Sequence, residues 1–200
     1  MKVGVFGGAF DPPHVGHLII TEGVRTALDL DQVLFIPYTI GPHRPGGPVV
    51  EASHRLRMLE LSTGDNEYFE IDDLELQRGG VSYTIDTLRS LAQTHPGDEI
   101  VLIVGSDQLP VFSDWKEWKA ILDMAQVAVI ERPDFSLENG PEELIDRMIP
   151  VPLPLLLISS TMIREKVAAG LSIQYLVLPA VAGYIEEQGL YLDDSSEEAE

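Results

Sequence analysis

Apolar residues gather along the chain into short runs, and longer stretches with a helical spacing separate these runs. The first run, at residues 2–6, is β-branched and aromatic, which is typical of a strand buried on both faces of a parallel sheet. Beyond it, apolar side chains at Leu18, Ile19, Val24 and Leu28 follow one face of a helix. The chain is therefore expected to open with a strand, a turn rich in glycine and proline, and a helix.

The same alternation continues to the end of the chain. Further strands are expected at residues 33–37, 69–71, 100–104, 127–130 and 155–158. Helices are expected at residues 14–28, 51–63, 84–94, 114–124, 141–147, 161–169 and 180–188. This order predicts an α/β fold, a Rossmann-like doubly wound parallel sheet of five to six strands with flanking helices and a small C-terminal helical part.

Two segments fall outside this pattern. Residues 39–50 hold three prolines and three glycines, so we expect an exposed loop over the carboxyl ends of the strands, where ligands bind. Residues 193–200 are acidic and polar, and they cannot bury apolar surface. The chain is thus expected to form one domain over residues 1–192, followed by an acidic disordered tail.

Composition then limits the classes of function. The chain has 200 residues, with 33 Asp and Glu against 13 Lys and Arg, a formal net charge of −20 and no cysteine. A duplex-binding protein needs a basic footprint, so general nucleic-acid binding is excluded, whereas a small anion can still bind in a locally positive pocket. Disulfides, thiolate catalysis and cysteine-based zinc sites are excluded as well.

The sequence predicts neither a membrane span nor a signal peptide. No apolar stretch approaches the about 20 residues that a membrane span requires, and the N-terminus does not resemble a signal peptide. We therefore expect a cytoplasmic protein without a membrane partner.

The turn at residues 7–13 carries the first candidate chemistry. It leads into His14-Val15-Gly16-His17, which places two histidines in the first turn of the predicted helix. Acidic residues usually settle at a helix N-terminus, where N–H groups are unpaired and the charge is partly positive, yet the first acid is Glu22. The pattern predicts that an external anion such as phosphate completes the site. The alternative is an ordinary glycine turn followed by structural histidines.

A second strand-to-helix junction lies at residues 158–164. Ser159, Ser160 and Thr161 can cap the helix, but no Glu or Gln stands three residues beyond any of them, and Arg164 occupies the first turn. Hydroxyl, N–H and guanidinium groups together suit a phosphate chain, and an ordinary cap with a surface arginine is the alternative. By contrast, the helix expected from Asp114 has a capping box completed by Glu117 and needs no anion.

Together the two junctions resemble the nucleotidyltransferase superfamily, with its His-x-Gly-His and Ser-Ser/Thr-x-Ile-Arg elements. Four further segments are similar to bacterial nicotinate-nucleotide adenylyltransferases, so the resemblance covers residues 1–192. These segments are Pro42-His43-Arg44, residues 73–88, Val104-Gly105-Ser106-Asp107 followed by Trp115 and Trp118, and residues 184–191. Arg44 where the family often has lysine, Leu178 and the acidic tail are departures that leave the motif residues intact.

The resemblance implies that the phosphate of nicotinate mononucleotide attacks the α-phosphorus of ATP, which gives nicotinate adenine dinucleotide and pyrophosphate in NAD biosynthesis. It implies catalytic roles for His14, His17 and Arg164. The residues implied to bind ATP are Gly7, Gly8, Phe10, His14, His17, Gly105, Asp107, Arg132, Ser160, Thr161 and Arg164. The residues implied to bind nicotinate mononucleotide are Ala9, Phe10, His43, Arg44, Tyr83, Thr84 and Trp115.

Elementary chemistry indicates how some of these residues would act. Trp115 offers a flat apolar surface for the pyridine ring, whereas Trp118 is expected to be structural. Backbone N–H groups around Tyr83 and Thr84, at a predicted helix start, can bind the pyridine carboxylate. Mg²⁺ is expected to arrive with the ATP phosphates, because it keeps waters and needs no carboxylate cage, so no metal site on the protein is predicted.

Other functions remain as alternatives at this point. An adenylyltransferase for nicotinamide mononucleotide or phosphopantetheine, or a cytidylyltransferase, would share both junctions. An aminoacyl-tRNA synthetase is disfavoured because the chain lacks a Lys-Met-Ser-Lys-Ser run and a basic surface. A nucleotide-sensing module that does not catalyse is disfavoured by the intact His14, His17 and Arg164. Related enzymes are often dimers, so a homodimer is an expectation from the resemblance.

Overall fold

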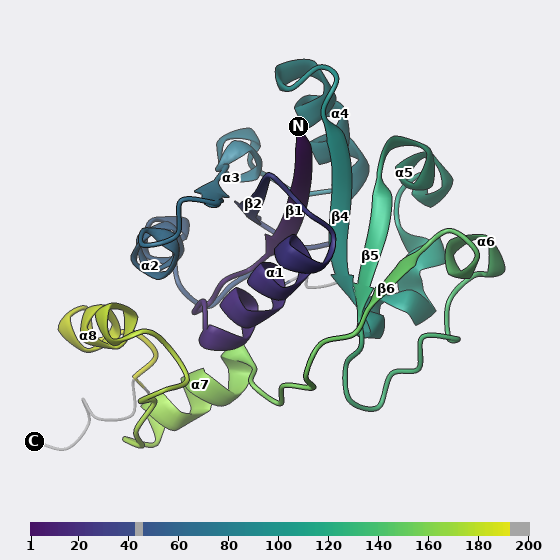
Figure 1. Ribbon diagram of the computed structural model, residues 1–200. Helices are drawn as coiled ribbons and strands as arrows, with labels where there is room; N and C mark the ends of the chain where they lie inside the picture. The colour runs from purple at the N-terminus through teal and green to yellow at the C-terminus, as the bar shows by residue number, and fades with distance from the viewer. Residues whose placement is uncertain (43–45, 193–200) are drawn as a thin grey trace, which may run out of the picture.

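Six parallel strands form the central sheet of the computed structural model, which describes residues 1–42 and 46–192. The strands are β1 (Lys2–Gly8), β2 (Gln32–Pro37), β3 (Phe69–Ile71), β4 (Glu99–Gly105), β5 (Gln126–Ile130) and β6 (Ile149–Val151). Their order is β3-β2-β1-β4-β5-β6, so the chain winds outward from β1 and then crosses to β4 and winds outward again (Figure 1). This is the doubly wound arrangement that the sequence predicted. In such sheets the ligand crevice lies at the carboxyl ends of the strands where the winding reverses, here between β1 and β4.

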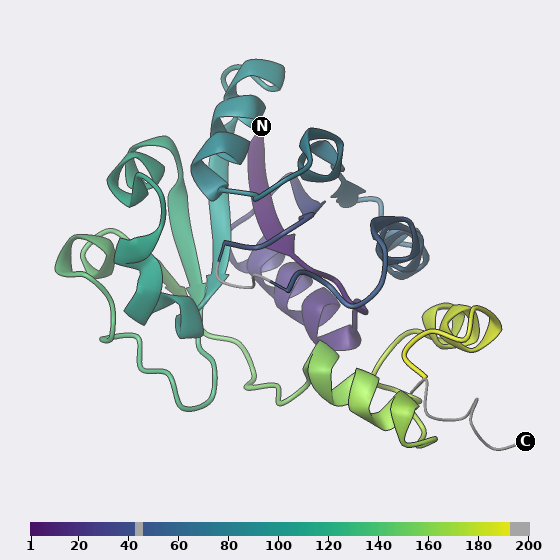
Figure 2. The ribbon, with the colours of Figure 1, turned by 180° about the vertical axis from the view of Figure 1, so that it is seen from behind.

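Helices follow most of the strands. They are α1 (Val15–Ala27), α2 (Ala52–Thr63), α3 (Leu74–Arg78), α4 (Thr84–Thr94), the 3-10 helix η1 (Ser106–Asp114), α5 (Trp118–Met124), α6 (Glu142–Ile145), α7 (Ser160–Ala168) and α8 (Pro179–Glu187). Helix α1 lies in front of the sheet in Figure 1 and behind it in Figure 2, whereas α4 lies on the opposite face. None of the helices that the structure describes is long and apolar enough to cross a membrane.

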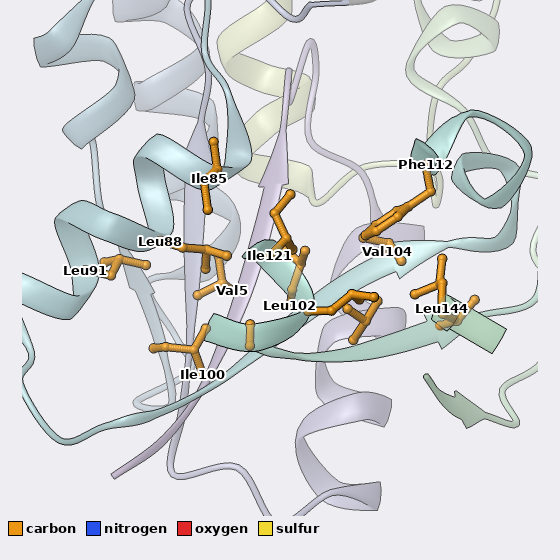
Figure 3. Packing of buried hydrophobic residues seen from close by; sticks show 14 of the residues in the cluster. Val5, Ile85, Leu88, Leu91, Ile100, Leu102, Val104, Phe112, Ile121 and Leu144 are labelled. Atoms are coloured by element: carbon orange, nitrogen blue, oxygen red, sulfur yellow. The ribbon is translucent and has the colours of Figure 1, made fainter. Parts of the chain in front are cut away.

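The two faces of the sheet carry separate apolar layers, because side chains alternate along a strand. Val3 and Val5 of β1 point to the face covered by α4, η1 and α5, where Leu88 and Phe112 pack against β4 (Figure 3). Phe6 points to the other face and packs with Phe10, with residues of α1 and with Leu59 of α2. The sheet is therefore buried on both sides, as the continuous apolar runs predicted.

The C-terminal helices form a third apolar cluster beside the sheet. Val181 and Ile185 of α8 and Ile163 of α7 pack together with Met58 of α2. In Figures 1 and 2, α7 lies at the beginning of α1 and α8 lies beside α2. The backbone N–H of Val15 donates to the carbonyl of Leu176 at 2.9 Å, so this C-terminal part is attached to the start of α1.

The strand expected at residues 155–158 is wrong. The sixth strand is Ile149–Val151, which pairs with β5 in the register Ile130↔Val151. Ile149–Val151 thus takes the place beside β5 that the later residues were expected to fill. They form an irregular segment instead, in which Leu157 is 79% exposed.

The helix expected at residues 114–124 is also wrong in its first turn. Asp114 ends η1, Trp115 has an extended backbone with φ −68° and ψ 139°, and α5 begins only at Trp118. Glu117 therefore closes no capping box, and its carboxylate accepts hydrogen bonds from Arg89 Nη1 at 3.0 Å and Nη2 at 2.6 Å. This bidentate pair with α4 competes with the local cap. Helix α3 was not expected from the sequence, and it is only five residues long.

Candidate active site

A cleft of about 760 Å³ opens at the carboxyl ends of the central strands, where the sheet topology places a ligand. Most of the residues that the sequence singled out line it. They are Gly7, Gly8, Ala9, Phe10, His14, His17, Tyr83, Thr84, Gly105, Asp107, Trp115, Arg132, Ser160 and Thr161. Arg164 lies just outside this lining, and His43 and Arg44 fall outside the described residues.

The first wall of the cleft is the turn between β1 and α1. His14 is the N-cap of α1, and the first turn of this helix holds no acidic residue. Gly8 is required here, because a Cβ at that position would lie 2.9 Å from Cζ of Phe10. Two N–H groups at the start of α1 already have acceptors, since Val15 donates to the carbonyl of Leu176 and His17 to the carbonyl of His14, both at 2.9 Å. The helix dipole still gives this end of the cleft a partial positive charge. The absence of an acidic residue from this turn agrees with the sequence, and binding of an anion there stays a prediction.

The two histidines of this turn form one stacked unit. Their rings lie 3.6 Å apart between centroids with an interplanar angle of 17°. The backbone N–H of His14 donates to Nδ1 of His17 at 3.2 Å. Because Nδ1 of His17 accepts this bond, the neutral ring carries its proton on Nε2. His17 is thus a hydrogen-bond donor with a defined tautomer.

Burial keeps both imidazoles neutral. It lowers the pKa of His14 from 6.5 to about 4, with a smaller contribution from the positive charge of Arg132. Burial, followed by the charges of His14 and Arg132, also holds the pKa of His17 well below its usual range. At neutral pH the pair therefore offers N–H donors rather than fixed positive charges.

These lowered pKa values predict a pH-dependent stability. The unfolded chain takes up a proton near pH 6.5, whereas folded His14, which is 4% exposed, resists it until about pH 4. The contribution of neutral His14 to the free energy of unfolding is therefore complete above pH 6.5, and it falls as the pH drops below that value. We expect the free energy of unfolding to fall by about 2 kcal/mol through His14 between pH 7 and pH 5.

Urea unfolding at several pH values measures this effect. A His14→Gln variant should lose much of the slope between pH 7 and pH 5. His95, at the end of α4 away from the cleft, provides the matched control, and His95→Gln should retain the wild-type slope. An unchanged slope in His14→Gln would contradict the assigned burial effect.

The second wall comes from the start of α7. Ser159 is its N-cap, and its Oγ accepts a hydrogen bond from the backbone N–H of Met162 at 3.2 Å. The hydroxyl of Ser160 donates to the carbonyl of Pro12 at 2.8 Å, and Nη1 of Arg164 donates to the carbonyl of Asp11 at 2.7 Å. The two predicted strand-to-helix junctions are thus hydrogen-bonded to each other, between residues that lie 148 and 153 positions apart in the sequence.

This geometry gives Arg164 a role that the sequence did not indicate. Its Nη2 donates to Oγ1 of Thr161 at 3.2 Å, so both ends of the guanidinium are engaged within the two junctions. In this arrangement Arg164 holds the turn together, and its predicted contact with phosphate stays a prediction.

The third wall is built where β4 and β5 end. Nε of Arg132 lies 3.7 Å from Oδ1 of Asp107, an ion pair longer than a hydrogen bond. This Nε is buried and has no hydrogen-bond partner among the described residues. Ser106 fixes the position of Arg132, because its Oγ accepts from the Arg132 backbone N–H at 2.8 Å and donates to the carbonyl of Phe135 at 2.9 Å.

The opposite side of the cleft joins Trp115 to the start of α4. Trp115 stacks on Phe112 with centroids 4.8 Å apart, and its buried Nε1 has no hydrogen-bond partner among the described residues. Tyr83 is the N-cap of α4 and lines the cleft together with Thr84 and Trp115, so the partly positive end of this helix lies at the cleft. Trp118 contacts Phe112 edge-on at 6.3 Å and is not part of the cleft lining, in agreement with its expected structural role.

Several lining residues were missed in the sequence. Lys116 has its Nζ 4.8 Å from the ring centroid of Tyr83 and 2.8 Å from Oδ2 of Asp86. Glu75 is buried, accepts a hydrogen bond from Thr87, and has its pKa raised by that burial. Lys116 directly follows Trp115, so its place in the chain was a usable signal. Glu75 had none, because its position depends on the unexpected helix α3.

Comparison with known proteins places this geometry in a family. The chain matches the family model described as Cytidylyltransferase-like over residues 5–166. It is 43% identical over 190 residues to the "Probable nicotinate-nucleotide adenylyltransferase" of Geobacillus thermodenitrificans, which covers 95% of this chain and 86% of that protein. The protein of the same name in Shouchella clausii is 38% identical over 194 residues, covering 97% and 98%.

A solved structure shares the fold. "Plasmodium falciparum nicotinic acid mononucleotide adenylyltransferase complexed with NaAD" has a TM-score of 0.80 at 20% identity, over 95% of this chain and 97% of that chain. The motifs, the six-stranded fold and the identity along nearly the whole chain agree. The chain belongs to the nicotinate-nucleotide adenylyltransferases, within the cytidylyltransferase-like family.

Proposed function

We propose that this protein transfers the adenylyl group of ATP to the phosphate of nicotinate mononucleotide. The observation that carries the proposal is that one cleft holds both the neutral histidine pair at the start of α1 and the stacking face of Trp115 beside the start of α4. The N–H donors of the histidine pair suit a triphosphate, and the flat face of Trp115 suits a pyridine ring. The family to which the chain belongs is named for this reaction.

The chemistry requires no covalent change in the protein. A phosphate oxygen of the mononucleotide attacks the α-phosphorus of ATP and forms the new P–O bond. The bond from the α-phosphorus to the bridging oxygen of the β-phosphate breaks, and pyrophosphate leaves with that electron pair. The protein therefore has to align the two phosphates and stabilise the developing charge.

The neutral histidine pair is suited to that task. His17 presents Nε2–H as a donor because its Nδ1 is occupied by the His14 backbone. We infer that this donor, His14 and the partly positive end of α1 face the triphosphate near the reacting phosphorus. Ser160, Thr161 and Arg164 are proposed to hold the β- and γ-phosphates, and Gly105, Asp107 and Arg132 the ribose and adenosine.

The acceptor half is proposed to bind at Trp115 and α4. The indole would stack on the pyridine ring, and the N–H groups around Tyr83 and Thr84 would bind the carboxylate. Lys116 adds a positive charge to this part of the cleft, although Asp86 offsets it at 2.8 Å. Ala9 and Phe10, with His43 and Arg44, complete the proposed acceptor set.

Mg²⁺ is proposed to enter with ATP. The described residues contain no group of three or more His, Cys, Asp or Glu side chains placed to hold a metal ion. Phosphate oxygens and water suit the octahedral preference of Mg²⁺, so ATP itself can carry the ion and have part of its charge neutralised. A homodimer in the cytoplasm is the expected form, and sedimentation of the purified protein measures the number of subunits.

Parallel acceptor assays test the proposed substrate. Initial rates of pyrophosphate release are measured with ATP and Mg²⁺ and with nicotinate mononucleotide, nicotinamide mononucleotide or phosphopantetheine. The proposal expects the highest kcat/KM with nicotinate mononucleotide. Pyrophosphate release with phosphopantetheine alone would overturn the substrate assignment. If none of the three acceptors supports release of pyrophosphate, a different class of protein is favoured.

Gly105→Ala probes the ATP half of the cleft separately. A Cβ at this position would lie 2.3 Å from Oδ1 of Asp107 and 3.1 Å from Nε of Arg132, so both side chains must shift. We expect KM for ATP to rise about tenfold, which is the effect of losing roughly one hydrogen bond to a charged group. KM for the mononucleotide should change little. Gly183→Ala is a matched control, because a Cβ there meets open space within α8. An equal rise in both KM values would contradict the assignment.

A further inference from the structure

Tyr191 lies at the far end of the described chain, yet its side chain is tied to the first turn. It is 9% exposed and has φ 64°, a left-handed conformation that is costly for a residue with a side chain. Its hydroxyl donates to Oδ1 of Asp11 at 2.7 Å, across 180 positions of sequence. Burial and the charge of Asp11 raise the pKa of Tyr191 far above its usual value, so the hydroxyl stays a donor.

Asp11 joins this hydroxyl to two other segments. It lies inside the turn between β1 and α1 and is 2% exposed. Its Oδ2 accepts a hydrogen bond from the backbone N–H of Val49 at 2.5 Å, at the end of the proline- and glycine-rich loop. A buried carboxylate is costly unless it is hydrogen-bonded or paired. One carboxylate therefore links the turn to Val49 and to Tyr191.

Arg55 of α2 supplies the facing positive charge. It is 2% exposed, and its Nη1 donates to the carbonyl of Ala9 at 2.7 Å. Burial lowers the pKa of Arg55, and the negative charge of Asp11 opposes that effect. The turn that carries Phe10 and His14 is thus bonded to Arg55 of α2 at Ala9 and to Tyr191 at Asp11.

We propose that Tyr191 is a positioning residue for the adenylyl transfer, which acts through Asp11 to hold the phosphate-binding turn and the backbone at Val49 in their reactive arrangement. The inference rests on the proposed function, because the turn matters to catalysis only if it grips the triphosphate. Tyr191 touches no substrate position itself, and it is not part of the cleft lining. Its contribution is geometric, and small displacements of a reacting group have large effects on rate.

Tyr191→Phe removes the hydroxyl and keeps the ring in its apolar cluster. We expect kcat with ATP and nicotinate mononucleotide to fall about tenfold. The dissociation constant for an ATP analogue with a methylene group between the α- and β-phosphorus should rise about fivefold. Tyr184→Phe is the matched control, because that hydroxyl is paired with Nδ1 of His54 in α2, at 2.9 Å, rather than with Asp11. It should change either constant by less than about twofold.

The analogue measurement needs no second substrate, so it separates this inference from the proposed function. An inactive wild-type enzyme that still binds the analogue more tightly than Tyr191→Phe would overturn the proposed function, and with it the catalytic role of Tyr191, while showing that the hydroxyl shapes the nucleotide-binding turn. An active wild-type enzyme whose two tyrosine variants have equal kcat and equal analogue binding would overturn the inference alone. A lower melting temperature with both constants unchanged would likewise show a merely structural hydroxyl.

A double-mutant cycle tests the route through Asp11. Asp11→Asn removes the charge that receives the Tyr191 hydroxyl. If Tyr191 acts through this carboxylate, Tyr191→Phe should have little further effect on kcat or analogue binding in the Asp11→Asn background. Independent, additive effects on both constants would contradict the proposed coupling.

Discussion

His17→Ala should reduce kcat by about 10²-fold, the loss expected when one preorganised donor to the transition state is removed. His17 is partly buried between Phe10 and His14, and the centroid of its ring lies 5.3 Å and 3.6 Å from the centroids of their rings. Its pKa lies well below 6.5 because of that burial, so it acts as a neutral Nε2–H donor. Steady-state rates at saturating ATP and nicotinate mononucleotide measure the effect.

The reduction should be specific to the transition state. KM for ATP is expected to change less than kcat, because the donor aligns with charge that develops during the transfer. His54→Ala is the control, since His54 pairs with Tyr184 outside the cleft at 2.9 Å and should retain wild-type kcat. A folded His17→Ala enzyme with unchanged kcat would remove His17 from the mechanism.

Trp115→Leu should raise KM for nicotinate mononucleotide by about 30-fold, because stacking of a base on an aromatic ring contributes about 1–3 kcal/mol. Leucine retains apolar contact with Phe112, so the wall of the cleft is kept while the flat surface is lost. KM for ATP should change little, because the adenosine is proposed to bind at the opposite wall. Rates measured with each substrate varied in turn separate the two constants.

Trp118→Leu provides the matched comparison. Trp118 packs on the same phenylalanine at 6.3 Å but does not line the cleft. Both variants should lower the melting temperature, whereas only Trp115→Leu should raise KM for the mononucleotide. Equal KM values in the two variants would show that Trp115 is structural as well.

The architecture followed from local pattern because parallel strands buried on both faces leave continuous apolar runs. Residues 155–158 show where this reasoning fails. Their apolar character is that of a strand, but the sheet edge beside β5 is already filled by Ile149–Val151. Pairing is a property of the whole sheet, so a short apolar run cannot reveal whether a partner is free.

The first turn of the helix expected at Asp114 fails for a related reason. The Asp-x-x-Glu spacing favours a cap, yet Glu117 instead binds Arg89 of α4 at 2.6 Å. A contact between residues 28 positions apart replaced the local one. The sequence could not show this, because the ion pair depends on how α4 and α5 pack.

In the site, motif residues gathered as predicted, whereas their supports did not appear in the pattern. The pair His14 and His17 was visible because their spacing places them in one helical turn. Asp11, Arg55 and Tyr191 were not singled out, since their roles depend on contacts between distant segments. Such buried polar partners are the part of a site that sequence spacing conveys least.

The stereochemistry at the α-phosphorus tests the central claim most directly. The enzyme is supplied with nicotinate mononucleotide, Mg²⁺ and one diastereomer of ATP that carries sulfur on the α-phosphorus, and the configuration of the dinucleotide is determined. Direct attack of one phosphate on the other in a single step predicts a dinucleotide with inverted configuration at that phosphorus. A product with retained configuration, which requires a nucleotidylated enzyme, or the absence of any dinucleotide would contradict the account.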